Sequence, residues 1–367
     1  MRTGNRGPTV VLLDATGAPP KSGGVELWAI QLVRHWVQMF GPGELVVVGS
    51  RLLESKLTDL QVSFCPLPTN STISRAFSQL ILIPALFIRY RSQRLLTLNS
   101  VLSPLLFGAN TTLINHDWRH KLRPKEFGAG ARAYRRIWEF STRRSRKVIA
   151  ISEKTKRETI EFARREDVFV VPPGGDHLLE IAASINPPLG LSPRSFLLSY
   201  GHHSNKRPDL AVRALVHLLR LSSDRRLSLV VLGTKEGHKL DLEELSSRLR
   251  VNQFVHLIDH ASEQEYSWLV RNALAVLILS TDEGYSIPVA EARSVGTPVV
   301  VSELSGISGT IHTGVAVTGE HPRDVARVVL RLTATQVGQS DSTDSVCAPV
   351  TTWGSTVSKV RSIVMDA

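Results

Sequence analysis

The feature that most constrains the fold is an alternation of short apolar runs with longer amphipathic segments. TVVLLDA (residues 9–15) and ELVVVGS (44–50) have the length and aliphatic content of buried strands. Between them, after a glycine turn at 22–24, apolar residues recur at helical spacing. A strand, a helix and a second strand in this order imply a parallel pair joined by a crossover. The chain is therefore predicted to be an α/β protein.

The same alternation runs through the chain twice. Further strands are predicted at 94–100, 111–117, 147–153 and 168–176, and then at 195–201, 227–233, 254–260, 274–280 and 297–303. The length of 367 residues exceeds what one core usually supports, and proline and glycine accumulate in SINPPLGLSPR (184–194). We predict two Rossmann-like, doubly wound domains, at 1–187 and 188–345, and a C-terminal helix at 346–367 that packs back toward the first domain. The two domains are expected to enclose a cleft at the carboxyl ends of their strands, where such sheets bind ligands.

Cysteine usage and hydropathy argue against several classes of protein. Cys65 and Cys347 are far apart and lack the spacing of metal ligands, so we expect neither a disulfide framework nor a zinc site, and a cytoplasmic location fits. The N-terminal run VVLL is too short for the core of a signal peptide. LILIPALFI (80–88) is about half of a membrane span and contains a proline, so we expect no transmembrane helix. This run is either a buried helix or an interfacial patch.

The net charge of +11 is confined to the first half of the chain. Residues 1–187 hold 26 lysines and arginines against 15 aspartates and glutamates, whereas residues 188–367 hold 18 of each. Basic residues are densest at 119–127 and 132–147. An acidic partner of the first half is one interpretation, with an anionic membrane surface, an acidic glycan and nucleic acid as candidates. A solvated helix face is the other. No RNA- or DNA-binding motif accompanies the charge, so nucleic acid is not expected.

The stretch STDEGYSIPVAEARSVGTPVVVS (280–302) places two carboxylates around a helix start. Glu283 and Gly284 lie in the loop after a strand, and Pro288 favours the first turn of a helix. Glu291 falls about one turn into that helix. Free N–H groups at the helix start and two carboxylates suit a ligand that is rich in hydroxyl or phosphate oxygens. The alternative is that both glutamates are ordinary surface charges.

Three other strand ends carry polar or glycine residues. GHHSNKR (201–207) begins with Gly201 and sets Lys206 and Arg207 before a helix, which matches a diphosphate in charge, although a basic surface loop is the alternative. It lacks the P-loop pattern. Gly23 and Gly24 form a short glycine turn after the first strand, and His116 in NHD (115–117) ends another strand, where a histidine is often structural.

Together these segments resemble the retaining glycosyltransferases of family 4, which have the two-domain GT-B fold. STDEGYSIPVAEARSVGTPVVVS is similar to the E-x7-E signature of that family, and SYGHHSNKRPDLAVRAL to its diphosphate-binding strand, loop and helix. SGGVE (22–26), NHD, VIAISEKTK (148–156) and VVPPGGD (170–176) resemble further family segments. The second glycine that usually follows the first glutamate is replaced here by Ser286.

The resemblance implies a role for each matching residue. Glu291 would hold the ribose hydroxyls of a nucleotide, and Lys206 and Arg207 would neutralise the departing diphosphate. Glu283 would hold the donor sugar, and His116 would contact the sugar near the reacting carbon. The remaining binding residues implied by the resemblance are Gly23, Gly24, Gly201, Gly284, Tyr285 and Ser286.

These roles imply an enzyme that is independent of metal and cofactor. The expected reaction moves a hexose, with a mannose-like sugar favoured and GDP-mannose preferred to a UDP-hexose, to a saccharide or lipid-linked acceptor. Cell-surface polysaccharide or lipopolysaccharide synthesis, on the inner face of the plasma membrane, is the expected setting. The alternative is a non-catalytic protein that uses the basic first half of a GT-B scaffold to bind an anionic membrane or nucleic acid.

Overall fold

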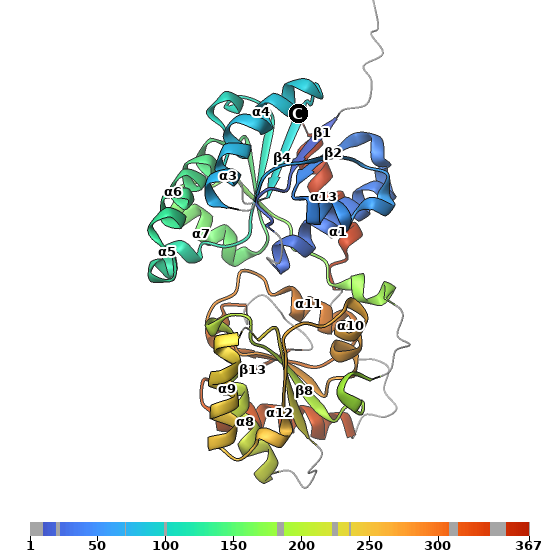
Figure 1. The fold of residues 1–367 in the computed structure, drawn as a ribbon, viewed down its shortest axis with the longest axis vertical. Helices are drawn as coiled ribbons and strands as arrows, with labels where there is room; N and C mark the ends of the chain where they lie inside the picture. Colours follow the sequence, from blue (N-terminus) through green and yellow to red (C-terminus); the bar gives the residue numbers. More distant parts are fainter. Residues whose placement is uncertain are drawn as a thin grey trace, which may run out of the picture. The chain divides into compact units, whose positions relative to one another are not determined.

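The computed structural model describes residues 10–19, 23–69, 71–98, 101–181, 187–221, 227–234, 236–307, 315–337 and 350–366. The chain divides into two compact units (Figure 1). Unit 1 comprises Met1–Pro173 and Thr352–Ala367, and unit 2 comprises Gly174–Thr351. Ser22 and Cys347 lie outside the described residues.

The described part of unit 1 contains a seven-stranded sheet in the order β3-β2-β1-β4-β5-β6-β7, and every neighbouring pair is parallel. Its strands are β1 (Val11–Asp14), β2 (Leu45–Gly49), β3 (Ser63–Pro66), β4 (Arg94–Leu98), β5 (Thr111–Asn115), β6 (Lys147–Ala150) and β7 (Val168–Val170). The central strands are almost wholly buried, as expected of parallel strands that are covered on both faces.

The helices of unit 1 surround this sheet (Figure 1). They are α1 (Gly24–Phe40), α2 (Arg51–Ser55), α3 (Thr72–Phe77), α4 (Ile83–Arg89), α5 (Arg119–Leu122), α6 (Ala129–Arg144), α7 (Glu153–Ala163) and α13 (Trp353–Met365). A π-helical turn, η3 (Ser78–Leu82), joins α3 to α4. The last helix, α13, packs on α1 within unit 1, where Trp353 is fully buried beside Trp28.

The described part of unit 2 contains a six-stranded parallel sheet in the order β10-β9-β8-β11-β12-β13. Its strands are β8 (Phe196–Tyr200), β9 (Ser228–Leu232), β10 (Val255–Ile258), β11 (Ala275–Ile278), β12 (Val299–Ser302) and β13 (Val315–Thr318). Its helices are α8 (Pro208–Leu221), α9 (Glu236–Arg248), α10 (Glu263–Asn272), α11 (Ile287–Ser294) and α12 (Pro322–Val337). Successive residues of a strand face opposite sides of this sheet. Leu229 and Val231 pack with residues of α8, whereas Val230 packs with residues of α10.

The prediction of two doubly wound α/β units is confirmed, whereas two strands were missed. The edge strand β3 is half exposed and ends in a proline, so its sequence lacks the apolar run of a central strand. β13, an edge strand of the sheet in unit 2, is short and only partly buried. Both segments have too little apolar sequence to be predicted, although the edge strands β7 and β10 were.

The division between the units differs from the expected one. It falls after Pro173 rather than after residue 187. The segment η6 (Asp176–Glu180) belongs to unit 2 because Leu178 joins its core and His177 reaches the α11 side chain Glu291. Gly175 packs so closely on α11 that a Cβ there would lie 2.3 Å from the Ala290 backbone.

The apolar run at 80–88 belongs to a longer helical segment than the sequence predicted. α3, η3 and α4 form one stretch of 18 residues, Thr72–Arg89, which is long and apolar enough to cross a membrane by length and composition alone. Only part of this stretch is buried. The helix lies on the sheet of unit 1 through Ile83, which joins a core cluster with Leu12 and Leu95.

Candidate functional site

The strand order of unit 2 places its switch point between β8 and β11. From β8 the chain moves outward through β9 to β10, and from β11 it moves the opposite way through β12 to β13. The loops that follow β8 and β11 therefore leave the sheet side by side at its carboxyl edge. In doubly wound sheets this position is where ligands bind. Both of the principal sequence-predicted segments, 201–207 and 280–291, lie there.

Backbone hydrogen bonds join these two loops. Thr281 N donates to Asn205 O at 2.9 Å, and the Asn205 side-chain amide donates to Asp282 O at 3.2 Å. Glu283 N in turn donates to Ser305 O at 2.9 Å. The site is thus held by backbone contacts among three loops, which fixes where the side chain of Glu283 begins.

Lys206 and Glu283 form an ion pair at the switch point. Lys206 Nζ lies 2.5 Å from Glu283 Oε1, and Ser280 Oγ donates to the same oxygen at 2.5 Å. The two charged side chains are only 15% and 10% exposed. The structure therefore brings together two residues that the sequence placed 77 positions apart and assigned to different parts of one ligand.

Arg207 is also engaged by carboxylates. Its guanidinium NH1 lies 2.9 Å from Glu320 Oε2, and its Nε lies 3.4 Å from Asp209 Oδ1. Glu320 is held in turn by the hydroxyl of Ser302. The backbone of Arg207 has a φ of 52°, in the left-handed region that residues other than glycine seldom adopt. Arg207 therefore ties the β8 loop to the segment that follows β13.

Glu291 lies inside unit 2 and is only 2% exposed. It is the fifth residue of α11, and its two oxygens have separate partners. Tyr266 on α10 donates its hydroxyl to Oε2, and His177 Nε2 lies 3.1 Å from Oε1. The hydroxyl of Tyr200 lies 3.0 Å from that of Tyr266. The sequence predicted either a carboxylate that binds ligand hydroxyls or an ordinary surface charge, and the structure shows a buried carboxylate with protein partners on both oxygens.

The two tyrosines of this network remain protonated. Burial raises the pKa of both Tyr200 and Tyr266 well above the usual tyrosine value, and the Glu291 carboxylate raises it further. Because both hydroxyls keep their protons, Tyr200 donates to Tyr266 and Tyr266 donates to Glu291. Glu291 is held in one orientation by this chain of donors.

The start of α11 combines left-handed backbone with a buried hydroxyl. Ser286 is the N-cap residue, with φ 69° and ψ 80°. It is 7% exposed, and its Oγ has no hydrogen-bond partner among the described residues. Burial raises the pKa of the neighbouring Tyr285, which Arg293 and a hydrogen bond with Thr351 oppose. Gly284 precedes these residues in the same loop.

Gly201 at the end of β8 is required by lack of space. A Cβ there would lie 2.7 Å from Thr234 Cγ2 and 3.0 Å from Val231 Cγ1. Its amide donates to Leu232 O at 2.8 Å, which holds the start of the β8 loop against β9. The function of this glycine in the fold is thus close packing of the loop that carries Lys206.

The remaining predicted residues lie in unit 1. Gly23 is the N-cap of α1, after β1, with a φ of 63°, and α1 begins at Gly24. His116 follows β5 and is 6% exposed, with its ring edge-on to Trp28 at 5.7 Å. The switch point of this sheet lies between β1 and β4, so Gly23 is on it and His116 is one strand away.

Burial lowers the pKa of His116 to about 4, although the neighbouring Asp117 opposes this. The imidazole is therefore neutral near pH 7. A neutral imidazole can donate one hydrogen bond to a ligand hydroxyl but brings no positive charge.

Sequence reasoning missed several residues that hold the site. Asn205 joins the two loops. Ser280 donates a hydrogen bond to Glu283, and Glu320 pairs with Arg207. Tyr266 and His177 hold Glu291. Glu320 and Tyr266 come from segments distant in sequence, so no local spacing indicates them. Asn205 and Ser280 lie inside the predicted loops and could have been included with Lys206 and Glu283.

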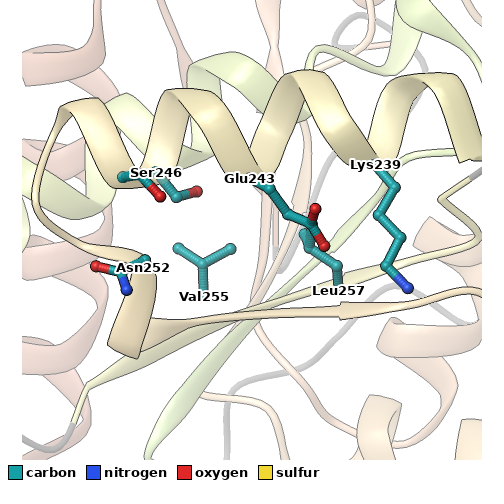
Figure 2. A pocket seen from close by; sticks show the side chains of 7 residues that line it. Lys239, Glu243, Ser246, Asn252, Val255 and Leu257 are labelled. Atoms are coloured by element: carbon teal, nitrogen blue, oxygen red, sulfur yellow. The ribbon is translucent and has the colours of Figure 1, made fainter.

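A pocket between α9 and the edge strand β10 lies elsewhere in unit 2 (Figure 2). In Figure 2 the side chains of α9 point toward Val255 and Leu257 of β10. Its lining residues are Lys239, Glu243, Ser246, Ser247, Asn252, Val255 and Leu257. β10 is separated from β11 by β9 and β8, so this pocket is not at the switch point.

A comparison with known families decides the identity of the chain. Residues 144–363, more than half of the chain, match the model described as family 4 glycosyltransferase in conflict systems. Residues 22–177 match the model described as glycosyltransferase family 4. The chain belongs to the family 4 glycosyltransferases. The predicted family is confirmed.

Relatives of this chain with curated descriptions include D-inositol 3-phosphate glycosyltransferases. That of Nocardia farcinica is 28% identical over 194 residues, which cover 49% of this chain and 43% of the relative. That of Jonesia denitrificans is 28% identical over 217 residues, which cover 53% of this chain and 50% of the relative. The chain thus spans about half the length of the curated relatives that it matches.

Solved structures confirm the fold of this glycosyltransferase. HepE from Anabaena, in complex with UDP and glucose, has a TM-score of 0.71 at 16% identity and covers 98% of this chain and 100% of its own. WaaG, a glycosyltransferase involved in lipopolysaccharide biosynthesis, has a TM-score of 0.67 at 15% identity, covering 98% and 100%. At this level of identity they show the GT-B fold and nothing more specific.

Proposed function

We propose that the protein transfers a hexose from a nucleoside diphosphate sugar to a saccharide or lipid-linked acceptor in the synthesis of a cell-surface polysaccharide. The observation that carries the donor part is the Lys206–Glu283 pair at the switch point of unit 2, beside the first turn of α11. A cation and the positive end of the helix dipole favour negative charge at this position. A diphosphate that leaves a sugar develops such charge.

The proposed step exchanges one bond at the anomeric carbon for another. The bond from that carbon to the diphosphate oxygen breaks, and its electron pair leaves with the diphosphate. The acceptor hydroxyl oxygen forms the new bond on the same face of the sugar, and its proton passes to the departing phosphate oxygen. Lys206 would stabilise the leaving group, and Glu283 would orient Lys206 and accept hydrogen bonds from sugar hydroxyls. His116, as a neutral imidazole, would donate a hydrogen bond to the sugar.

Glu291 is proposed to hold the nucleotide ribose. Its orientation by Tyr266 and His177 supports this role, because a carboxylate held rigidly loses little entropy when it accepts ribose hydroxyls. The ribose would share the carboxylate with the tyrosine or displace it. Arg207, fixed by Glu320, would add positive charge beside the diphosphate.

The transfer is proposed to proceed without a divalent cation. Lys206, Arg207 and the α11 N-terminus would supply the positive charge that a metal ion supplies elsewhere. The expected result is that the transfer rate is unchanged when a chelator replaces added magnesium or manganese. A rate that vanishes with the chelator and returns with metal would contradict this part.

Two donors have support. The resemblance of SYGHHSNKRP to mannosyltransferase-like segments favours GDP-mannose, and the complexes of HepE with UDP and with UDP-glucose support a UDP-hexose as the second candidate. The curated relatives act on an inositol phosphate, by their names, so a phosphorylated acceptor suits the basic first half of this chain. A cytoplasmic location is part of the proposal.

A donor panel tests this proposal. Hydrolysis and transfer from GDP-mannose, UDP-glucose and other nucleotide sugars are measured for the natural chain, for Glu283→Gln and for Lys206→Met. Each variant is expected to lower kcat by roughly 100-fold or more, which is typical when an electrostatic stabiliser is lost. Glu244→Gln, which alters an exposed carboxylate of α9, is the matched control and is expected to keep full activity.

Two results would overturn the proposal. Turnover that Glu283→Gln and Lys206→Met leave intact would remove the switch-point pair from the chemistry. No turnover with any donor, together with tight binding of RNA or anionic vesicles, would favour the non-catalytic binding protein instead.

A further inference from the structure

The helical stretch Thr72–Arg89 in unit 1 turns its apolar side outward. Ile73, Phe77, Ile81 and Ile88 are 83%, 52%, 51% and 75% exposed. They follow one another at intervals of four, four and seven residues, which places them along one side of a helix. The inward side carries buried polar residues, Ser78 and Gln79, as well as the buried Ile83 and Pro84. A surface helix of a water-soluble domain normally carries polar residues on its outward side, whereas this one carries a second apolar row there.

Buried hydrogen bonds fix this orientation. Gln79, which is 1% exposed, donates to Thr16 Oγ1 at 2.8 Å and accepts from the hydroxyl of Tyr134 at 2.9 Å and from Val101 N at 3.2 Å. Ser78 donates to Pro68 O at 2.8 Å. Rotation of the helix would leave these polar groups buried without partners, at a cost of about 1–3 kcal/mol each. The apolar side is therefore held toward solvent.

The exposed apolar row continues onto neighbouring elements of unit 1. Ser103 donates to Leu80 O at 2.8 Å, and Leu102 N donates to Ser141 Oγ on α6 at 2.9 Å. This connection places η4 (Pro104–Leu106) between η3 and α6. We define the apolar face as Ile73, Phe77, Ile81, Ile88, Leu105 and Phe140, all of them more than 40% exposed. α3, α4 and α6 lie on the same side of unit 1 in Figure 1.

The apolar face is bordered by charge of one sign. Residues 60–116 contain no aspartate or glutamate, and Arg89 and Arg91, at and just after the end of α4, are exposed. On α6, Arg132, Arg136 and Arg144 are exposed, and Arg144 lies over the ring of Phe140 at 5.4 Å. The carboxylate of α6, Glu139, is buried and paired with Lys121 and Arg143.

We propose that the apolar face docks unit 1 on the surface of an anionic lipid bilayer. The helix would lie in the plane of the interface, with Ile73, Phe77, Ile81 and Ile88 among the acyl chains and the arginines on lipid phosphates. Its buried hydrogen bonds to the domain exclude a spanning orientation while unit 1 is folded. The charges around the apolar face are positive, and they match a lipid surface that is negative over its whole area. This docking is independent of which sugar the protein transfers.

Vesicle flotation tests the proposal with the full chain. The probes are vesicles of phosphatidylcholine alone and of phosphatidylcholine with phosphatidylglycerol. Phe77→Ser/Ile81→Ser tests the apolar contribution, and Leu221→Ser/Leu240→Ser in unit 2 is its control, since both leucines are 63% exposed. Arg136→Gln/Arg144→Gln tests the charge, and Arg213→Gln/Arg220→Gln in unit 2 is its control.

Binding of the natural chain to the anionic vesicles is expected, with little binding to the neutral ones and a decline as salt rises from about 50 mM to about 500 mM. The partition coefficient of Phe77→Ser/Ile81→Ser is expected to fall by about tenfold or more. Each arginine removed is expected to lower it by roughly fivefold. The two control variants are expected to bind as the natural chain does.

Three results would overturn the proposal. One is binding of Phe77→Ser/Ile81→Ser that equals that of the natural chain, and another is equal binding to neutral and anionic vesicles. The third is a natural dimer that Phe77→Ser/Ile81→Ser dissociates, without vesicle binding by either, which would assign the face to a second copy of the chain. Circular dichroism of every variant checks that the fold is intact.

Discussion

At the scale of single residues, the candidate site stores conformational cost at two positions. Arg207 and Ser286 have left-handed backbone, which costs a residue with a side chain roughly 1–2 kcal/mol. Ser286 also buries a hydroxyl that lacks a partner among the described residues. Such costs persist where they serve binding or catalysis. For Ser286, a ligand that accepts from its hydroxyl would satisfy the buried group.

Substitution of Ser286 separates these two costs. Ser286→Ala removes the hydroxyl and keeps the strained backbone, whereas Ser286→Gly removes both. Without ligand, Ser286→Gly is expected to be about 1 kcal/mol more stable than Ser286→Ala in urea unfolding of unit 2. Both variants are expected to bind the donor nucleotide sugar more weakly in calorimetry. Unchanged donor affinity in both would remove the hydroxyl from the binding site.

A second prediction at this scale concerns pH. Burial lowers the pKa of His116 to about 4 in the folded state, against about 6.5 when it is unfolded. Between these values the unfolded chain binds the extra proton, so the stability of unit 1 is complete above about pH 6.5 and decreases as the pH falls toward 4. The limiting slope for this residue is about 1.4 kcal/mol per pH unit. His116→Gln is expected to reduce the decrease.

Urea unfolding at pH 7 and pH 5, followed by tryptophan fluorescence, measures this effect. The signal reports mainly unit 1, which contains Trp28, Trp36, Trp118, Trp138 and Trp353, whereas Trp268 lies in unit 2. His321→Gln, which alters an exposed histidine of unit 2, is the control. A unit 1 that gains stability on acidification would refute the prediction.

At the scale of elements, α13 is the piece that completes unit 1. Thr356 Oγ1 donates to Pro172 O at 2.7 Å, and Arg361 forms two bonds of 2.8 and 2.7 Å to Glu44 while lying over the ring of Phe40. Lys147 Nζ donates to two carbonyls at the end of the helix. A helix from the end of the sequence thus closes a domain that begins at the other end.

Trp353 is the buried anchor of this helix. Trp353→Ala is expected to destabilise unit 1 by about 3–5 kcal/mol, because it removes the largest apolar side chain from a fully buried position. Thermal and urea unfolding of the full chain measure the loss. Trp268→Ala, in unit 2, is expected to destabilise that unit and to leave unit 1 unchanged. Equal effects of both substitutions on both units would contradict the division of the chain.

At the scale of the whole molecule, the two units differ in continuity. Unit 2 is one segment, Gly174–Thr351, and it contains Lys206, Glu283 and Glu291. Unit 1 needs two segments from opposite ends of the chain. The donor part of the proposed site is thus contained in a single continuous stretch.

Two fragments test this difference. Residues 174–351 alone are expected to unfold cooperatively and to bind GDP or UDP, with the affinity lowered by Glu291→Gln. Residues 1–173 alone lack α13 and are expected not to unfold cooperatively. Circular dichroism and calorimetry give both results. A folded 1–173 fragment would show that α13 is dispensable for unit 1.

A feature of this protein could be predicted from the sequence when a short segment of the chain carries its whole pattern. The buried central strands and the amphipathic helices were predictable because a parallel sheet covered on both faces demands continuous apolar runs. The family was predictable because the carboxylates, the basic pair and the glycines occupy short segments with fixed spacing. β3 and β13 were missed because SFCP and VAVT offer too little apolar sequence to stand out from the loops around them.

The amino-acid sequence by itself thus determined the doubly wound architecture, the family and the loops that carry Lys206, Glu283 and Glu291. Only the tertiary structure decided which groups these side chains contact. Glu291 is enclosed by Tyr266 and His177, Arg207 is held by Glu320, and Lys206 meets Glu283. These partners lie up to 114 residues apart, as His177 and Glu291 do (291 − 177), and it is the order of strands in the sheet that brings them together. Strand order depends on long-range packing, which no local spacing records.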